Sequence, residues 1–335
     1  MCEERSCPWH TCTTKFVCYC SRLSVSLCAQ IKFAQYTHFM EQYLCGRKAL
    51  EYWGILETCK ILSLPEKEEY VVFSKRDCYR PSGVHWCQFT SAKRYTENDV
   101  CTLPYLFLRY AHELSLLKLI FLGLQICACP TGQVPQCTVR RLKDCALSLK
   151  GHQGRRKALQ ALQYIQNKSC SPMESKLYMH LCLPNSLGGC GFPQAMLNHP
   201  IRVGSNQFYL DLYFPTVRLG VEYDSYEYHN NARSFSQDNF RDAKLRTAGY
   251  QLVHVKPGQL QRIEAFQDLA VNLSRLLRKP IYIRTEKFLE NFKELFYLFK
   301  PSRNGPAWLS DLPKFGGVPQ AYDQYQNRAG KILLP

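Results

Sequence analysis

No cysteine lies beyond Cys190, although the 335-residue chain contains 18, and no two of them form a Cys-x-x-Cys pair. The pairs Cys18/Cys20 and Cys127/Cys129 are separated by a single residue, whereas zinc knuckles need a gap of two or more. The first ten residues, MCEERSCPWH, contain no apolar run of the kind found in a secretory signal peptide. We therefore expect free thiols and a cytoplasmic location, and neither a zinc site nor a secreted disulfide framework.

Long apolar runs and acidic residues are also scarce. The longest apolar run, residues 103–130, is interrupted by Arg109, His112, Glu113 and Lys118, so it predicts one or two buried helices and no membrane span. The chain has 27 Asp and Glu against 43 Lys and Arg, which gives a net charge of +16. This excess favours a polyanionic partner, because cationic side chains release counterions from phosphates when they bind.

The most informative stretch of the chain, residues 208–255, opens with a predicted β-hairpin. An alternation with a period of two runs through residues 208–214, and it resumes at Val217 after Pro215-Thr216. This pattern predicts two strands joined by a two-residue turn. The residues expected on one apolar face are Phe208, Leu210, Leu212 and Phe214 from the first strand and Val217, Leu219, Val221 and Tyr223 from the second.

The other face of this hairpin carries acids. With a two-residue turn, Asp211 lies opposite Gly220 and diagonal to Glu222, at a Cα separation of about 7–8 Å. Asp224 lies one step further along the same face. Such carboxylates repel one another, so a metal ion or basic partners would explain why they are gathered. A solvated strand face is the alternative explanation.

A helix and a further strand are predicted after the hairpin. Ser236 is placed to cap a helix that runs to about Ala248, and Gly249 is placed to end it. Residues 250–255 (YQLVHV) then predict another strand. This order of elements is typical of a nuclease core.

The combined pattern resembles the PD-(D/E)xK nuclease superfamily, and within it the small Vsr-like endonuclease-domain proteins. Members of that group show an Asp on the first strand, an acid-x-Asp-Gly element with a following His, and a helix with Asp and Arg that leads to a Gly-aromatic strand. The resemblance covers residues 169–284. The matching positions are Asp211, Glu222, Asp224, His229, Asp238, Arg241 and Gly249-Tyr250.

This resemblance implies an α/β (α+β) fold with a C-terminal restriction-endonuclease-like core, a mixed β-sheet flanked by helices. We place this Vsr-like domain at residues 166–300 and a tail at residues 301–335. Residues 1–165 are predicted to form an accessory domain, mainly helical with a few strands, and this domain is a candidate for DNA binding.

The sequence departs from the family pattern at two positions. Asp224 occupies the place of the superfamily's usual Lys, as is common in this branch, and Ser225 occupies the place of the following Gly. The first departure leaves the general base of the reaction unassigned.

Basic residues concentrate before the nuclease-like region and on its predicted helix. Residues 139–168 carry eight Lys and Arg against a single acid, Asp144, whereas a solvated helix face usually mixes both signs. We therefore expect phosphate contacts from this region and from the helix after the hairpin. The candidate nucleic-acid-binding residues are Arg140, Arg141, Arg155, Arg156, Lys157, Arg233, Arg241 and Lys244.

Glu174 has two interpretations. Ser171, Pro172 and Glu174 fit a capping box at the N-cap, N1 and N3 positions of a helix, which would explain the acid without catalysis. The resemblance also implies an acid on the first helix of the nuclease core at about this distance before Asp211. Both roles are open.

The leading hypothesis is a divalent-metal-dependent DNA endonuclease, with RNA not excluded as a substrate. Asp211, Glu222 and Glu174 would hold Mg²⁺ or Mn²⁺, and Asp224 would be a further ligand or would orient the attacking water. His229 could protonate the leaving oxygen, since its ordinary pKa near 6.5 suits proton transfer at neutral pH; a surface histidine is the alternative.

Two other function classes remain open. A non-catalytic DNA-binding regulator, or an antitoxin of the AbiEi kind, would keep a nuclease-like fold, and the missing Lys favours this class. A basic structural or protein-interaction module would explain the charge and leave the acidic hairpin unexplained.

Overall fold

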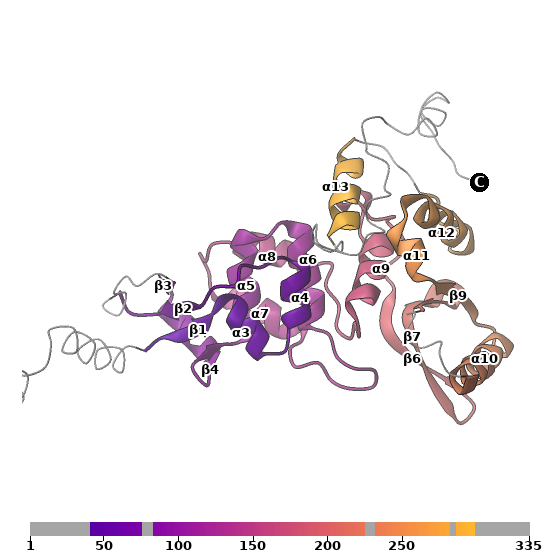
Figure 1. Cartoon of the computed structure of the whole chain (residues 1–335), viewed down its shortest axis with the longest axis horizontal. Coiled ribbons are helices and arrows are strands. Elements are labelled where there is room, and N and C mark those ends of the chain that lie inside the picture. Colours follow the sequence, from indigo (N-terminus) through magenta and orange to yellow (C-terminus); the bar gives the residue numbers. More distant parts are fainter. Residues whose placement is uncertain (1–40, 76–82, 225–231, 282–285, 299–335) are drawn as a thin grey trace, which may run out of the picture.

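The computed structural model describes residues 41–75, 83–224, 232–281 and 286–298, without the side chains of residues 232–238, 286 and 287. The protein is a mixed α/β fold with two mixed sheets flanked by helices. Figure 1 shows one sheet and its helices at one end of an elongated molecule and the other sheet at the opposite end. The predicted fold class is confirmed at this level.

The first sheet is small and has the strand order β3-β2-β1-β5-β4. It pairs β1 with β2 antiparallel and with β5 parallel. Its strands are β1 (Tyr43–Cys45), β2 (Glu69–Val72), β3 (Val84–Trp86), β4 (Thr96–Glu97) and β5 (Val100–Cys101).

Helices pack beside this sheet and fill the N-terminal half of the described chain. The chain turns between α3 and α4 at Gly54, which has φ 81°. The apolar run at residues 103–130 forms α5 and α6. These helices are α3 (Gly46–Tyr52), α4 (Leu56–Ile61), α5 (Leu103–Glu113), α6 (Leu116–Ile126), α7 (Val139–Ser148) and α8 (Arg155–Ala161).

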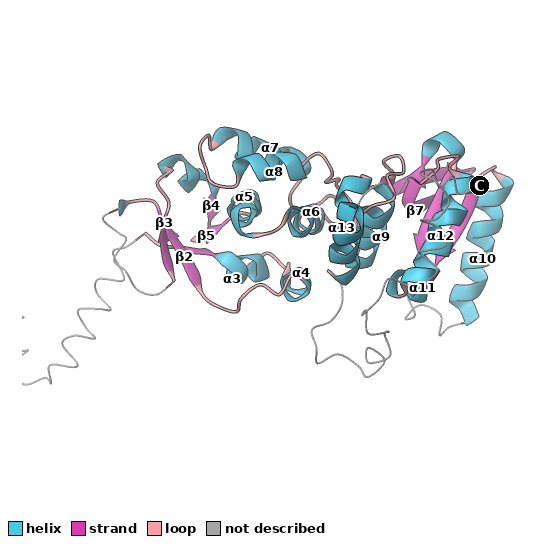
Figure 2. Ribbon diagram, turned by 90° about the horizontal axis from the view of Figure 1, so that it is seen from above, coloured by secondary structure: helices cyan, strands magenta, loops and turns pink. Residues whose placement is uncertain are grey.

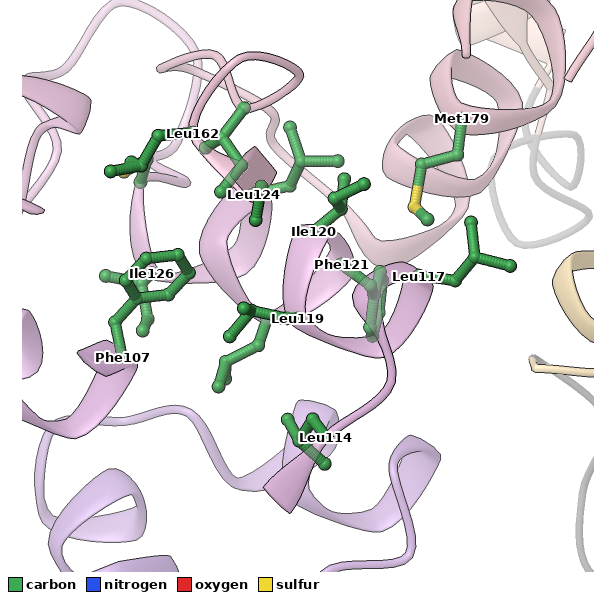
Figure 3. Close-up of a cluster of buried hydrophobic side chains, with 14 of the residues drawn as sticks. Phe107, Leu114, Leu117, Leu119, Ile120, Phe121, Leu124, Ile126, Leu162 and Met179 are labelled. Carbon is green, nitrogen blue, oxygen red and sulfur yellow. The ribbon is translucent and has the colours of Figure 1, made fainter. Parts of the chain in front are cut away.

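Helix α6 connects the two halves of the molecule. Almost all of its side chains are buried, and it packs against α5 and α8 on one side and against α9 (Pro172–Cys182) on another. Figure 3 shows Leu117 and Ile120 of α6 close to Met179 of α9. One cluster of buried residues therefore extends from Tyr43 to Leu298, and the predicted domain boundaries near residues 165 and 300 stay predictions.

The second sheet has the strand order β6-β7-β8-β9, with β8 and β9 parallel and the other pairs antiparallel. Figure 1 shows α9, α11 and α12 above this sheet and α10 below it, and Figure 2 shows α9 and α10 on either side of the strands. Its strands are β6 (Met196–Val203), β7 (Asn206–Phe214), β8 (Leu219–Tyr223) and β9 (Gln251–Val255); the C-terminal helices are α10 (Ala232–Thr247), α11 (Pro257–Gln261), α12 (Ile263–Leu276) and α13 (Glu286–Tyr297).

Helix α10 begins earlier than the sequence predicts. It starts at Ala232, so Ser236 lies inside it and is not its N-cap. Its end is as predicted: Gly249 has φ 85°, a conformation that glycine adopts without strain, and its amide donates to the carbonyl of Arg246.

Within the described residues, no helix combines the length and the apolar character needed to cross a membrane. The cysteines of this part of the chain are all free thiols, and most of them are buried. They pack as small apolar side chains in the core. The predicted tail, residues 301–335, lies outside the described residues.

Candidate active site

The hairpin of β7 and β8 has a different register from the predicted one. Phe214 pairs with Leu219 and Leu212 pairs with Val221, so four residues connect the strands. The two-residue turn is wrong because Pro215 opens a 3₁₀ turn, and Arg218 ends it in the left-handed region with φ 49°. Gly220 pairs with Tyr213 and not with Asp211. Asp211 instead lies at the level of Glu222 and Tyr223, and the Tyr223 amide donates to Asp211 Oδ2 at 2.9 Å.

The predicted apolar face of β7 is also interrupted, at Asp211. Leu212 belongs to the main core, as predicted, whereas Leu210 packs in a second cluster with Leu245 of α10. Opposite Asp211 on β6, Asn198 has φ 44°. Local departures from regular pairing often occur beside active sites, because they redirect side chains. The strict alternation predicted for residues 208–214 is therefore wrong at this point.

Glu174 lies in the first turn of α9, and Ser171 is the N-cap as predicted, but the Glu174 side chain binds the amide of Cys170 and not that of Ser171. The Ser171 Oγ accepts a hydrogen bond from the Glu174 amide at 3.1 Å. In return, Glu174 Oε2 accepts hydrogen bonds from the amide of Cys170 at 2.9 Å and from Asn198 Nδ2 at 2.8 Å. Since Asn198 lies opposite Asp211 on the neighbouring strand, these contacts bring the Glu174 carboxylate to the hairpin acids.

The electrostatics show that Glu174, Asp211 and Glu222 form one carboxylate cluster. Burial raises the pKa of Asp211 well above its ordinary value, and the charges of Glu174 and Glu222 raise it further. Burial also raises the pKa of Glu174, and the charge of Glu222 adds to this effect. Three elements, α9, β7 and β8, therefore hold three carboxylates within reach of one another's charge at a cost in desolvation and repulsion.

Arg241 of α10 neutralises one member of this cluster. Its Nη1 donates to Glu222 Oε2 at 2.6 Å, its Nη2 donates to Glu222 Oε1, and Nη2 also donates to the carbonyl of Tyr209 at 2.6 Å. Even so, burial keeps the pKa of Glu222 above its ordinary value. Arg241, predicted as a phosphate contact, therefore holds an acid of the cluster.

A second polar group adjoins the cluster on the same face of the sheet. His254 of β9 is the register partner of Glu222. It lies between two carboxylates, with Nδ1 3.0 Å from Asp224 Oδ1 and Nε2 2.7 Å from Asp242 Oδ2. The hydrogen bond and charge of Asp224, with the contribution of Asp242, outweigh burial and raise the pKa of His254 to about 9.

Sequence reasoning did not assign a role to His254 or Asp242. His254 alternates with apolar residues in the strand QLVHV, and only the parallel pairing of β8 and β9 brings it beside Glu222. Asp242 follows the matched Arg241 directly, which is the one signal that could have drawn attention to it. Asp224 holds His254, with 3.0 Å between Asp224 Oδ1 and His254 Nδ1.

The raised pKa of His254 predicts a pH-dependent component of stability. Its folded pKa of about 9 exceeds the unfolded value near 6.5. Protonation therefore stabilises the fold fully below about pH 6.5, and this contribution is lost as the pH rises through about 9. We expect His254→Gln to lower the free energy of unfolding at pH 6 by on the order of 1–2 kcal/mol, allowing for partial exposure.

Urea unfolding in EDTA at pH 6 and pH 10 measures this effect. The difference between His254→Gln and the wild type should shrink at the higher pH. His112→Gln, which changes an exposed histidine, is the matched control and should show no pH-dependent difference. A constant deficit across the pH range would contradict the assignment.

The predicted basic residues of α7 and α8 have mixed placements. Arg140 and Arg156 are exposed, as is Arg141, whose Nη1 donates to the carbonyl of Gln136 at 3.1 Å. Arg155 and Lys157 instead tie elements together, since they donate to the carbonyls of Ala146 at 2.8 Å and Leu114 at 2.7 Å respectively. The exposed arginines are therefore the better placed phosphate contacts.

The remaining predicted site residues lie on or before α10. Lys244 Nζ donates to Asn206 Oδ1 at 2.6 Å and lies 4.4 Å from the ring centroid of Phe240. Arg233 lies within α10, and its side chain is not described. His229 lies outside the described residues.

The carboxylate cluster fits a divalent cation in chemistry but is not arranged as a finished ligand set. Carboxylate oxygens are the ligands that Mg²⁺ and Mn²⁺ favour, and the repulsion that raises the pKa of Asp211 would be relieved by a cation. Among the described residues, however, no three His, Cys, Asp or Glu side chains are positioned to hold one metal ion. Arg241 occupies both oxygens of Glu222, so binding requires rearrangement there.

No family model matches the chain. Two curated proteins of Mycobacterium tuberculosis are similar to part of it: the uncharacterized protein Rv2248 of strain H37Rv and the uncharacterized protein MT2308 of strain CDC 1551 / Oshkosh. Each is 25% identical over 128 residues, which is 38% of this chain and 45% of the relative. The chain thus spans less than half of the length of these relatives. No solved structure matches it.

Proposed function

We propose that the protein is a divalent-metal-dependent endonuclease that hydrolyses phosphodiester bonds in DNA. The observation that carries the proposal is the convergence of Glu174, Asp211 and Glu222 from α9, β7 and β8. Arg241 compensates only the charge of Glu222. Burying Glu174 and Asp211 beside it costs free energy, so a cationic ligand is the simplest reason to keep the three carboxylates together.

The order of elements around the cluster supports the same proposal. An acid-bearing helix, three antiparallel strands, a helix and a parallel strand follow one another from α9 to β9. The PD-(D/E)xK and Vsr-like proteins that the sequence resembles use this order for their nuclease core. We include in the proposal that the chain is a PD-(D/E)xK protein of the Vsr-like kind. We also propose that it is cytoplasmic.

In the proposed reaction, different residues would bind the metal ion, position its ligands and donate a proton. Asp211, Glu222 and Glu174 would hold the metal ion, and Arg241 would position Glu222. When bound, Mg²⁺ or Mn²⁺ supplies Lewis-acid stabilisation of the scissile phosphate and lowers the pKa of a bound water. His254, kept protonated by Asp224 and Asp242, adds a positive charge beside Glu222. His229 remains the predicted proton donor for the leaving oxygen.

The substrate class is inferred from charge. The net charge of +16 and the exposed Arg140, Arg141 and Arg156 favour a phosphate backbone as partner. DNA is the proposed partner, and RNA is the alternative substrate that the same contacts would accept.

A second candidate function has its own supporting observation. Arg241 already saturates both oxygens of Glu222, and Asp224 replaces the usual Lys. A non-catalytic DNA-binding regulator, of the AbiEi antitoxin kind, would keep such a satisfied ion pair and would need no metal.

Metal-dependent nicking separates these candidates. Purified protein is incubated with supercoiled or single-stranded DNA in Mg²⁺, in Mn²⁺ or in EDTA, and binding is measured in parallel. The nuclease proposal expects nicked and linear products only with metal, together with salt-sensitive binding in EDTA. Binding without cleavage under every metal condition would instead favour the regulator.

A further inference from the structure

A pocket of about 450 Å³ lies between the N-terminal helices and the start of α9. Three segments form its wall: the turn between α3 and α4, the loop of residues 127–138 after α6, and the residues that precede α9. Its size falls within the usual range for small-molecule sites.

The pocket shares a wall with the carboxylate cluster. Cys170 lines the pocket, and the Cys170 amide donates to Glu174 Oε2 at 2.9 Å. The loop of residues 127–138 also touches both regions. Its residues Cys129 and Pro130 line the pocket, whereas the neighbouring Thr131 Oγ1 lies 3.3 Å from Asn198 Oδ1, beside Asp211. A ligand in the pocket would therefore lie next to the proposed scissile position.

The lining of the pocket suits a flat, neutral ring with polar edges. Trp53 offers an indole ring that is fixed in place, because its Nε1 donates to the carbonyl of Cys101 at 2.8 Å. The amide side chains of Gln133 and Gln136 lie at exposed positions of the wall. Among the lining residues, Glu57 is the one acidic residue, and there is no Lys, Arg or His. Aromatic stacking combined with amide hydrogen bonds is how proteins hold unstacked nucleobases.

Two basic residues lie near the pocket, Lys168 and Arg141. Lys168 is exposed, and its amide donates at 2.9 Å to the carbonyl of Cys127, two residues before Cys129 of the pocket wall. Arg141 contacts the carbonyl of Gln136 at the other side of the pocket. Phosphates on either side of a base in the pocket would therefore meet a cation.

We propose that this pocket binds one unpaired nucleobase of a nucleic-acid strand whose adjoining phosphate lies at the carboxylate cluster. The inference rests on the proposed function in that it takes the ligand to be a nucleic-acid strand. It adds that the substrate is single-stranded or locally unpaired beside the cut, since a base inside a duplex cannot enter the pocket.

The test is equilibrium binding in EDTA, followed by fluorescence anisotropy of short single-stranded oligonucleotides. One probe is intact, and a matched series carries a single abasic residue at each position in turn. Val134 lines the pocket and is 84% exposed, so Val134→Trp should fill the pocket without disturbing the core. Tyr297→Trp on α13, where the residue is 37% exposed, is the matched control.

For the wild type and for Tyr297→Trp, we expect one abasic position to weaken binding about tenfold, the usual scale of losing one stacked base. Val134→Trp should bind the intact probe as weakly as the wild type binds that abasic probe. Equal affinity of the wild type for every probe, or unchanged discrimination in Val134→Trp, would overturn the proposal.

The outcome is independent of catalysis. Binding is measured in EDTA, so no metal-dependent cleavage takes place during the measurement. Discrimination without any metal-dependent nicking would overturn the nuclease proposal and support the base-binding pocket. Nicking without discrimination would support the nuclease proposal and overturn the base-binding pocket.

Discussion

Replacing Asp211 by Asn is expected to reduce metal-dependent cleavage by roughly a thousandfold or more, since a catalytic metal ion contributes several kcal/mol to transition-state stabilisation. Asn keeps the shape of the side chain and can still accept the hydrogen bond that the Tyr223 amide gives to Asp211 Oδ2 at 2.9 Å. DNA binding in EDTA should not weaken, because the substitution removes a negative charge from the proposed phosphate site. The initial rate of supercoiled-plasmid nicking measures the loss.

The same substitution is expected to raise the melting temperature of the metal-free protein. Burial and the charges of Glu174 and Glu222 raise the pKa of Asp211, so the folded state binds the proton more tightly than the unfolded state. Wild-type stability therefore falls as the pH rises above the unfolded value near 4. The neutral Asn removes this penalty, and its advantage should be larger at pH 8 than at pH 5. Loss of activity with gain of stability is typical of functional sites.

Asp268→Asn is the matched control, because Asp268 is an exposed acid on α12. It should leave both nicking and melting temperature unchanged. Retained cleavage in Asp211→Asn would place the reaction elsewhere in the protein or in a contaminant. A lower melting temperature in EDTA at pH 8 would contradict the electrostatic description of the cluster.

Local sequence signals predicted the elements that carry the cluster. Alternation with a period of two identified β7 and β8, Gly249 marked the end of α10, and the capping box placed Glu174 in the first turn of α9. Each of these signals depends on residues within a few positions of one another. Such short-range chemistry is present in the sequence itself.

The contacts between elements could not be predicted in the same way. A hairpin register follows from the conformation of its turn, and the 3₁₀ turn at Pro215 moved Asp211 from Gly220 to the level of Glu222. The position of His254 beside Glu222 depends on a parallel pairing between strands that a whole helix separates. The partner of Arg241 depends on how α10 crosses the sheet. Neither the position of His254 nor the partner of Arg241 follows from residue spacing.

The second large effect is expected at Arg241. Its guanidinium holds Glu222 with two hydrogen bonds and also binds the carbonyl of Tyr209. The side chains of Arg241 and Glu222 are 21% and 12% exposed, so Arg241→Met would leave a largely buried carboxylate without its cation beside Asp211. Breaking such a pair on one side costs about 2–4 kcal/mol, less than for a fully buried pair. We expect a corresponding fall in the urea midpoint in EDTA.

A double-mutant cycle separates this ion pair from the packing of the arginine stem. If the unpaired charge of Glu222 causes the loss, Glu222→Gln should restore most of the stability in the Arg241→Met background, since both partners are then neutral. Arg246→Met is the matched control on α10, because Arg246 is 62% exposed and 3.8 Å from Asp242, and it should cost less than about 0.5 kcal/mol. An equal loss of stability in Arg241→Met and Arg246→Met, or no recovery of stability in the double variant, would show that Arg241 does not neutralise the buried charge of Glu222.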